Sequence, residues 1–536
     1  MESTIKSKVI TTFQLNGLTL RRDASQYLVS MLGSVPPEVL DPSLDIVIKN
    51  VQKLPLTSPM VDLATLEPIV AECMASGDDS SQGIFNVIDA FTVPHFTYNP
   101  DQRKLILKDS VKHSLFGSAE AKAQLFQDRY RVIQQRTLRH KLFAPQPLVS
   151  SERQQEGGFV LRPVEFLLGS SMRQGNVLSL GMLTQMKEGK YYLEDPSGSV
   201  QLDLSKTVSL DPAASYRGGI FTDHAFVLAE GFYEDHIFHV QTLGFPPLEP
   251  SSLTRRSGGC RQHFGTANLF GGPSSTTVKT NEKMRRLEAN NPDAMIVILS
   301  DVWLDQIKVL EKLQVLFTGY ANMAPVCFLL LGNFLSQPHG SHQPKVMKEC
   351  LRKLAALIAE HPTLLEDSHF VFVPGPRDVG MANILPRPGL PDQVTEEFRR
   401  KVPKSVFTTN PCRLQWGTKE VVVLREDVGA KLCRSALYVP AEVTGATVAR
   451  TLAANGHLLP LPLAAAPVFW PHDPALWLYP LPDLVVLGSR GASWGACPVA
   501  GCTFLYPGSF VINQFSFKVY MPASGDIEDS QIPSDT

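Results

Sequence analysis

The sequence predicts a multidomain chain with a helical bundle, a small β-barrel and an α/β layered domain. At 536 residues the chain is too long for one hydrophobic core. The apolar pattern changes twice, from helical spacing over residues 1–75 to short β-type runs from about 160, and to alternating strands and helices from about 285. Hydrophobic residues make up 43% and charged residues 19%, so each domain can bury a core.

Residues 1–75 are expected to form a small helical domain. Ala24, Tyr27, Leu28 and Met31 fall at i, i+3, i+4 and i+7, which is one face of a helix. The apolar positions of LDIVIKNVQKL (44–54) repeat this spacing after an Asp-Pro start. A third helix is expected around 62–75. Because no polar cluster suggests chemistry here, we interpret this domain as an adaptor.

Residues 76–159 are predicted to connect this domain to the next and to contain one long basic helix, at about 118–140. GDDSSQG (77–83) has the composition of a linker. Residues 101–141 carry ten Lys/Arg against four acidic residues. This charge could dock an acidic partner or nucleic acid, but we favour a solvated helix face, because charge runs on helices usually have that role.

Residues 160–280 are predicted to contain a closed barrel of the OB type and a following loop. Five short runs rich in Val, Leu, Tyr and Phe are separated by turn signals between about 177 and 245. Tyr191, Tyr192, Phe232 and Tyr233 could stack bases, as in single-strand binders. However, residues 177–245 hold four basic and nine acidic residues, a local charge of −5, and the whole chain carries −2. Negative charge repels phosphate, so we disfavour a free-standing nucleic-acid binder.

Residues 281–521 are predicted to form an α/β domain. AMIVILSD (294–301), VCFLLLGN (326–333) and HFVFVPG (369–375) read as buried parallel strands that alternate with amphipathic helices. SVFTTNPCRLQW (405–416) and KEVVVLRE (419–426) are expected in a second sheet. The tail 522–536 is polar and acidic, and is expected to be disordered. No run of 18 apolar residues occurs, so we expect no membrane partner.

Polar residues follow the strands of this domain, where catalytic groups gather in α/β folds. The strand ends read SDVW (300–303), GNFLS (332–336) and GPRD (375–378), and NGHL (455–458) comes later. This series resembles the calcineurin-like metallophosphoesterases, whose motifs DxH, GDxxD, GNH[DE], a lone His and GHxH hold two metal ions. The resemblance implies an α/β sandwich of that family, with candidate ligands at Asp301, Asn333, Asp378 and His457.

The motifs depart from that family where they would bind metal. Trp303 stands for the His of DxH, Asn333 for the bridging Asp, and Ser336 for the next carboxylate. Pro376 and Arg377 replace the Asn and His of the third motif, and no GHxH occurs. The eight cysteines form no CxxC pair that would indicate zinc. We therefore expect an inactive domain without catalytic, cofactor-binding or metal-binding residues, in which the four candidates cap helices or form core hydrogen bonds.

Several longer stretches resemble the B subunits of eukaryotic replicative DNA polymerases, and among them those of DNA polymerase epsilon. They include GMLTQMKEGKYYLEDPSGSVQLDLSK (181–206), LSDVWLDQ (299–306) and FTTNPCRLQW (407–416). The resemblance implies a non-catalytic scaffold in the nucleus whose barrel and phosphoesterase-like domain bind the zinc-binding C-terminal domain of the catalytic subunit. It further implies an N-terminal domain like a small AAA+ domain, which links the polymerase to the replicative helicase through GINS.

The same resemblance implies indirect contact with small histone-fold subunits, and weak or indirect contact with DNA. Two alternatives stay open at this point. One is a metal-dependent phosphoesterase with an unorthodox ligand set, and the other is a single-stranded nucleic-acid binder that uses the barrel and the basic helix.

Overall fold

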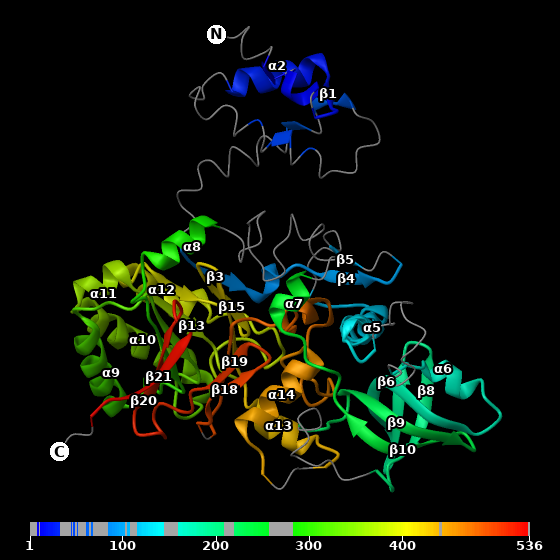
Figure 1. Cartoon of the computed structure of the whole chain (residues 1–536). Helices are drawn as coiled ribbons and strands as arrows, with labels where there is room; N and C mark the ends of the chain where they lie inside the picture. The colour runs from blue at the N-terminus through cyan, green and yellow to red at the C-terminus, as the bar shows by residue number, and fades with distance from the viewer. Residues whose placement is uncertain are drawn as a thin grey trace. The chain divides into compact units, whose positions relative to one another are not determined.

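The structure is a computed structural model and divides the chain into two compact units, residues 1–83 and 84–536 (Figure 1). Each unit is described by itself. The residues that the structure describes are 8–9, 11–14, 16–32, 44, 47–48, 51, 60–63, 66–67, 84–101, 104–107, 115–143, 159–207, 219–256, 282–438, 442–491 and 493–533.

The first unit has a small hydrophobic core of its own. Helix α2 (Arg22–Leu32) confirms the first predicted helix, and Ala24 and Leu28 on its apolar face are buried. Leu44, Val47, Ile48 and Val51 of the second apolar stripe are buried in the same core. Strands β1 (Thr19–Leu20) and β2 (Met60–Val61), which the sequence did not predict, pair in parallel. Leu54 and most of the third predicted helix lie outside the described residues.

The predicted five-stranded barrel is confirmed. Its closed strand order is β10-β8-β7-β6-β9. Inward positions alternate with outward ones, so that Leu183, Leu193, Val227 and Phe238 are completely buried. The short helix α6 (Val164–Leu168) packs Val164 and Leu167 into this core. The strands are β6 (Gln174–Lys187), β7 (Lys190–Asp195), β8 (Gly198–Asp203), β9 (Phe226–Glu234) and β10 (Ile237–Gly244).

The α/β region is a sandwich of two six-stranded sheets. The first sheet has the order β14-β13-β12-β11-β20-β21, with β11 to β14 parallel as the alternating pattern predicted. Helices α9 (Ile307–Tyr320), α10 (Gln343–Ala359), α11 (Pro362–Asp367) and α12 (Asp392–Lys401) pack on it through a large apolar core. Its strands are β11 (Ile296–Ser300), β12 (Cys327–Leu331), β13 (His369–Val373), β14 (Ser405–Phe407), β20 (Ser516–Met521) and β21 (Asp526–Gln531).

The second sheet has the order β18-β19-β17-β16-β15-β3. Helices α13 (Val428–Arg434) and α14 (Gly445–Asn455) pack against it. Between the two sheets, side chains such as Ile298 and Leu329 meet Leu414 and Val486 in a third core. Its strands are β3 (Phe85–Asp89), β15 (Cys412–Trp416), β16 (Lys419–Arg425), β17 (Leu484–Gly488), β18 (Gly495–Val499) and β19 (Cys502–Tyr506).

Two predictions about the flanks of the sandwich were wrong. Residues 84–89 were assigned to a connector, but β3 pairs along its length with β15 and buries Phe85 and Ile88. The tail from 522 was expected to be disordered, but Asp526–Gln531 forms β21 and pairs with β20. An edge strand exposes most of its side chains, so a polar composition suits it and does not reveal the backbone pairing. Ile532 beyond it is buried in the core.

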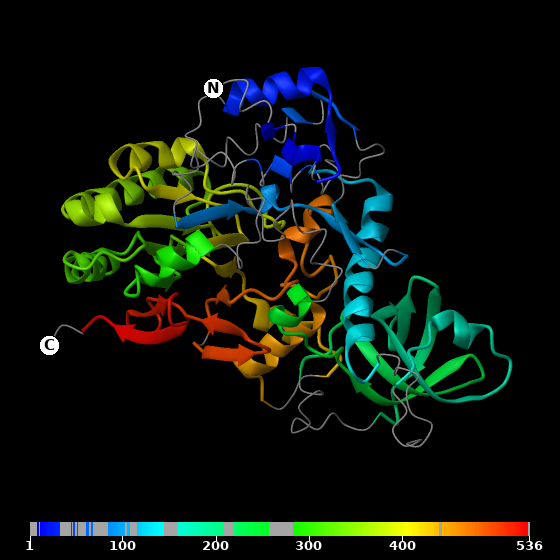
Figure 2. The same ribbon diagram turned by 45° about the horizontal axis from the view of Figure 1, so that its top comes forward.

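The long helix of the predicted connector is α5 (Ala119–Arg139), close to its expected bounds. Ser118 caps its first turn by accepting a hydrogen bond from the backbone N–H of Ala121. The hairpin β4 (Phe96–Asn99) and β5 (Lys104–Leu107) precedes it. In Figure 2 α5 runs between the barrel and the sandwich. In the described part of the chain, no helix combines the length and the apolar character that crossing a membrane requires.

Candidate functional site at the strand ends of the sandwich

Three of the four candidate residues meet where the strands of the first sheet end. Because β11, β12 and β13 are parallel, the turns that follow them lie at one edge. Asp301 Oδ1 accepts hydrogen bonds from the backbone N–H of Asn333 at 3.1 Å and from its Nδ2 at 3.3 Å. Asn333 Oδ1 in turn accepts from the backbone N–H of Arg377 at 2.9 Å. The three turns are therefore tied together by buried side chains.

Arg425, the last residue of β16, inserts its guanidinium group into this cluster from the second sheet. Its Nη2 donates to Asp301 Oδ1 at 2.7 Å, and both side chains are 0% exposed. Its Nη1 donates to the carbonyl of Gly488 at 3.3 Å, and its Nε donates to the carbonyl of Gly332. A permanent cation thus neutralises the carboxylate that would begin a metal site.

Asp378 is held by the turn that it belongs to. Its Oδ1 accepts from the backbone N–H of Phe334 and its Oδ2 from that of Gly375, both at 2.7 Å. Burial raises the pKa of Asp378 to about 6, although these backbone donors and the guanidinium groups of Arg387 and Arg425 favour the charged form. The side chain of Asp378 therefore connects the turn after β12 to the turn after β13.

Ser336, one of the replaced motif positions, has structural contacts of its own. Ser336 donates its hydroxyl to Asp305 Oδ2 at 2.6 Å, and its backbone N–H donates to Asp305 Oδ1 at 3.0 Å. Within the ranges that the structure describes, no three His, Cys, Asp or Glu side chains are placed to hold a metal ion. The donor set does not fit two divalent cations, because Asp301 already faces a guanidinium group and Asn333 carries no charge.

His457 lies apart from this cluster, next to α5. Its Nε2 lies 3.3 Å from Asp473 Oδ1, and its Nδ1 accepts from the backbone N–H of Leu459 at 2.9 Å. Asp473 also accepts from Trp477 Nε1 at 2.9 Å and forms an ion pair with Arg129 of α5. Burial and the charge of Arg129 lower the pKa of His457 to about 4. His457 is therefore a neutral member of a buried network that joins α5 to the sandwich.

The basic helix has an exposed face that includes Lys122, but three of its arginines contribute neither to the solvated face that we favoured nor to the open docking surface that we considered instead. Arg129 and Arg136 are 4% and 3% exposed. Arg136 donates to the carbonyl oxygens of Ala453 and Ala454 at the end of α14. Arg139 forms an ion pair with Glu249 at 2.7 Å. These arginines satisfy acceptors of the neighbouring domain, which a count of charges along the chain does not reveal.

The other face of α5 packs on the barrel. Tyr130 and Ile133 join Leu180, Met182 and Phe226 in one apolar cluster. Helix α5 therefore has an apolar side toward the barrel and a buried polar side toward the sandwich.

The barrel also contacts the sandwich directly. Asn455 Oδ1 at the end of α14 accepts from the backbone N–H of Phe226 at 2.8 Å, and Thr451 Oγ1 accepts from that of Ile220 at 2.9 Å. Thr222 donates its hydroxyl to the carbonyl of Pro460 at 2.9 Å. Buried hydrogen bonds of this kind are costly to break, so the two domains form one continuous body.

Two of the four aromatic residues considered for base stacking, Phe232 and Tyr233, have other contacts. Tyr233 is buried in the barrel core at 2% exposure. Phe232 stacks on His239 with ring centroids 4.8 Å apart, and Arg173 lies over the Phe232 ring at 4.7 Å. One ring of this tandem pair therefore fills the core, and the other already has a stacking partner.

Comparison with known proteins agrees with this domain order. Residues 1–73 match the family "DNA polymerases epsilon N terminal", residues 119–247 match "DNA polymerase epsilon subunit 2-like, OB-fold domain", and residues 296–495 match the family of DNA polymerase alpha/epsilon B subunits. The chain is 45% identical over 534 residues to DNA polymerase epsilon subunit 2 of Homo sapiens, with 98% of each chain covered. The chain belongs to the DNA polymerase epsilon subunit 2 family.

Other members of the epsilon subunit 2 family align over nearly the whole chain as well. The Drosophila melanogaster protein is 40% identical over 536 residues, covering 99% of this chain and 98% of its own. The DNA polymerase epsilon B subunit of Arabidopsis thaliana is 32% identical over 543 residues, covering 98% and 99%. As a member of the epsilon subunit 2 family, the chain is an accessory, non-catalytic subunit. The match to the OB-fold family begins at Ala119, the first residue of α5, which agrees with the packing of this helix on the barrel.

Proposed function

We propose that this chain is the scaffold of the DNA polymerase epsilon complex in the nucleus. In this proposal the barrel and the sandwich together bind the zinc-binding C-terminal domain of the catalytic subunit. The unit of residues 1–83 links the polymerase to the replicative helicase through GINS, and the small histone-fold subunits are reached indirectly. Contact with DNA is weak or made through the partner subunits.

The observation that carries the proposal is the way α5 joins the barrel to the sandwich. Arg129 and Arg136 reach into the sandwich while Tyr130 and Ile133 pack on the barrel. A partner that binds across both domains then meets a preformed surface and loses little conformational entropy on binding. The near-neutral charge of the whole chain, −2, favours a protein partner over a nucleic acid.

We further propose that the sandwich is an inactive calcineurin-like phosphoesterase domain. Two-metal hydrolysis requires two cations held close together by convergent carboxylate, amide and imidazole ligands. Here Arg425 neutralises Asp301, and His457 faces Asp473 and Arg129 instead of the strand ends. Purified chain with Mn²⁺ that cleaved a generic phosphodiester, and lost this activity on Asp301→Ala, would contradict an inactive domain.

The partner proposal is tested by truncation between the two compact units. The cut belongs at 83/84, because β3 begins at Phe85 and belongs to the second sheet. Residues 84–536 should bind the C-terminal domain of the catalytic subunit as tightly as the full chain does, in surface plasmon resonance with both purified. Residues 1–83 should bind purified GINS and should not bind the C-terminal domain of the catalytic subunit. Loss of binding by residues 84–536 would show that the division of labour is wrong.

A further inference from the structure

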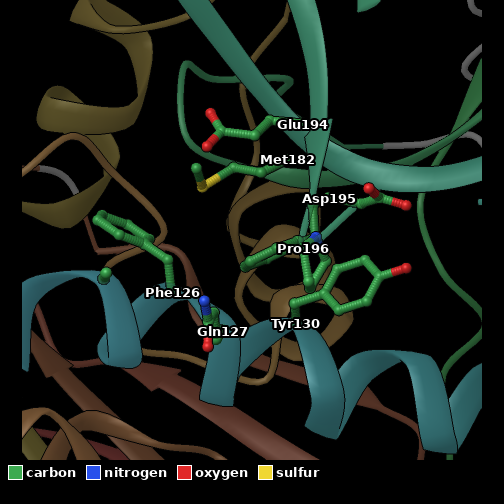
Figure 3. Close-up of a pocket in the computed structure, with 9 residues that line it drawn as sticks. Phe126, Gln127, Tyr130, Met182, Glu194, Asp195 and Pro196 are labelled. Carbon is green, nitrogen blue, oxygen red and sulfur yellow. The ribbon is translucent and has the colours of Figure 1, made fainter. Parts of the chain in front are cut away.

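A cavity of about 220 Å³ lies between α5 and the barrel (Figure 3). Phe126, Gln127 and Tyr130 line it from α5, as Figure 3 shows, and the barrel supplies the remaining wall. The apolar groups of the lining include Tyr130, Met182 and Phe226, which are 3–6% exposed. The described lining residues are Ala123, Phe126, Gln127, Tyr130, Met182, Glu194, Asp195, Pro196 and Phe226.

The charge at this cavity, which we call the α5–barrel pocket, is negative. The nine described lining residues include Glu194 and Asp195 but no Lys, Arg or His. Both carboxylate oxygens of Asp195 are hydrogen-bonded within the protein. Its Oδ1 accepts from the backbone N–H of Ser197 at 2.8 Å, and its Oδ2 accepts from that of Val164 at 3.0 Å. Glu194 has no hydrogen bond or ion pair from a side chain in the described part of the protein.

Neighbouring groups leave this negative potential in place. Arg129 lies over the Phe126 ring at 5.6 Å, but its charge is paired with Asp473. Burial and then the charge of Asp195 raise the pKa of Tyr130. Because Glu194 and Asp195 line the pocket and Arg129 is paired elsewhere, the pocket disfavours anions, including the phosphates of a nucleic acid.

The size of the pocket selects the kind of ligand. Small-molecule sites usually span about 300–1,000 Å³, so about 220 Å³ suits one or two side chains rather than a cofactor. We propose that the α5–barrel pocket docks a basic peptide segment of a partner protein. An apolar side chain of the segment packs on Met182 and Phe226, and an adjacent Lys or Arg pairs with Glu194. This inference does not depend on the proposed function.

A random dodecapeptide library displayed on phage tests the proposal with the full-length chain as target. The library is first depleted on Ala123→Trp, in which an indole at an exposed position of the lining fills the pocket. We expect the enriched sequences to pair Lys or Arg with a neighbouring apolar residue. One enriched peptide, labelled with fluorescein, then gives affinities by anisotropy. Circular dichroism melts of each variant verify folding.

Three variants assign the binding to the pocket. Glu194→Gln should weaken binding about two- to fivefold, which is the range for a partly exposed ion pair, and Ala123→Trp should abolish it. Glu188→Gln makes the same charge change at an exposed site in the turn of the β6–β7 hairpin and should leave the affinity unchanged. The proposal fails if no peptide is enriched, or if the enriched peptides lack basic residues. It also fails if Glu188→Gln weakens binding as much as Glu194→Gln, or if unlabelled oligothymidylate displaces the peptide.

Discussion

The ion pair between Asp301 and Arg425 can be tested directly, because neither side chain reaches solvent. In Arg425→Met an unbranched apolar side chain replaces the arginine, so much of the packing remains. The carboxylate of Asp301 then stays buried without its cation, and the carbonyls of Gly332 and Gly488 lose a donor. Removing one partner of a buried pair costs about 3–5 kcal/mol, so we expect a loss of stability of that size.

Tryptophan fluorescence during urea unfolding measures this loss of stability in the sandwich domain. All five tryptophans lie between residues 303 and 494, inside the sandwich, so their transition reports this domain and not the first unit. With a urea dependence of about 3 kcal/mol/M, the midpoint should fall by about 1–1.7 M. Arg434→Met is the matched control, since Arg434 is exposed on α13, and it should shift stability by less than about 0.5 kcal/mol.

A double variant separates the charge from the packing. Asp301 has a backbone φ of 54°, which asparagine tolerates better than most residues, so Asp301→Asn is the suitable partner change. Adding it to Arg425→Met removes the stranded charge while keeping an oxygen for the backbone N–H of Asn333. We expect about half of the lost stability to return. If the double variant is no more stable than Arg425→Met, or if Arg425→Met behaves like the exposed control, then the pair does not organise the strand ends.

Three further predictions concern α5, the buried histidine and the tail. Arg129→Met leaves Asp473 buried without its cation, so hydrogen exchange along α5 should quicken strongly, whereas Lys122→Met on the exposed face should not change it. The pKa of His457, about 4 in the folded chain, lies below its unfolded value of 6.5, so its stabilisation is present above pH 6.5 and is lost as the pH falls toward 4. Between pH 7 and 4.5, the free energy of unfolding of His457→Gln should therefore fall by about 2–3 kcal/mol less than that of the original chain in urea titrations. Equal decreases would refute this prediction. Deleting residues 526–536 turns β20 into an exposed edge, so light scattering should show aggregation, and a monodisperse product would contradict the role of β21.

Much of the architecture could be predicted from local patterns. The alternating runs between 177 and 245 specified the strands of the barrel, because inward and outward positions alternate along a half-buried strand. The apolar runs ending at Asp301, Asn333 and Gly375 specified buried parallel strands, and Asp301 and Asn333 form core hydrogen bonds, which is one of the two roles that we expected for them. The bounds of α5 were predicted within one residue, since Ser118 is a strong N-cap.

The partners of the charged residues could not be predicted in this way. Arg425 ends the apolar strand KEVVVLR, and that position was the one available signal that its charge is buried. Its partner Asp301 is 124 residues away. The arginines of α5 looked like a solvated face because Asp473 and the end of α14 lie more than 300 residues further along the chain. The polar strand β21 was taken for disorder because its pairing with β20 is made by backbone groups, which its polar composition does not reveal.

The sequence by itself determined the order and class of the domains and the residue types that stand at the strand ends. The periodicity of apolar residues and the identity of a side chain are both local properties. Only the tertiary structure decided that Arg425 neutralises Asp301, that His457 belongs to a different network, and that α5 joins two domains. The physical reason is that a buried charge takes its partner from whichever strand or helix the fold brings beside it, and distance along the chain carries no information about that choice.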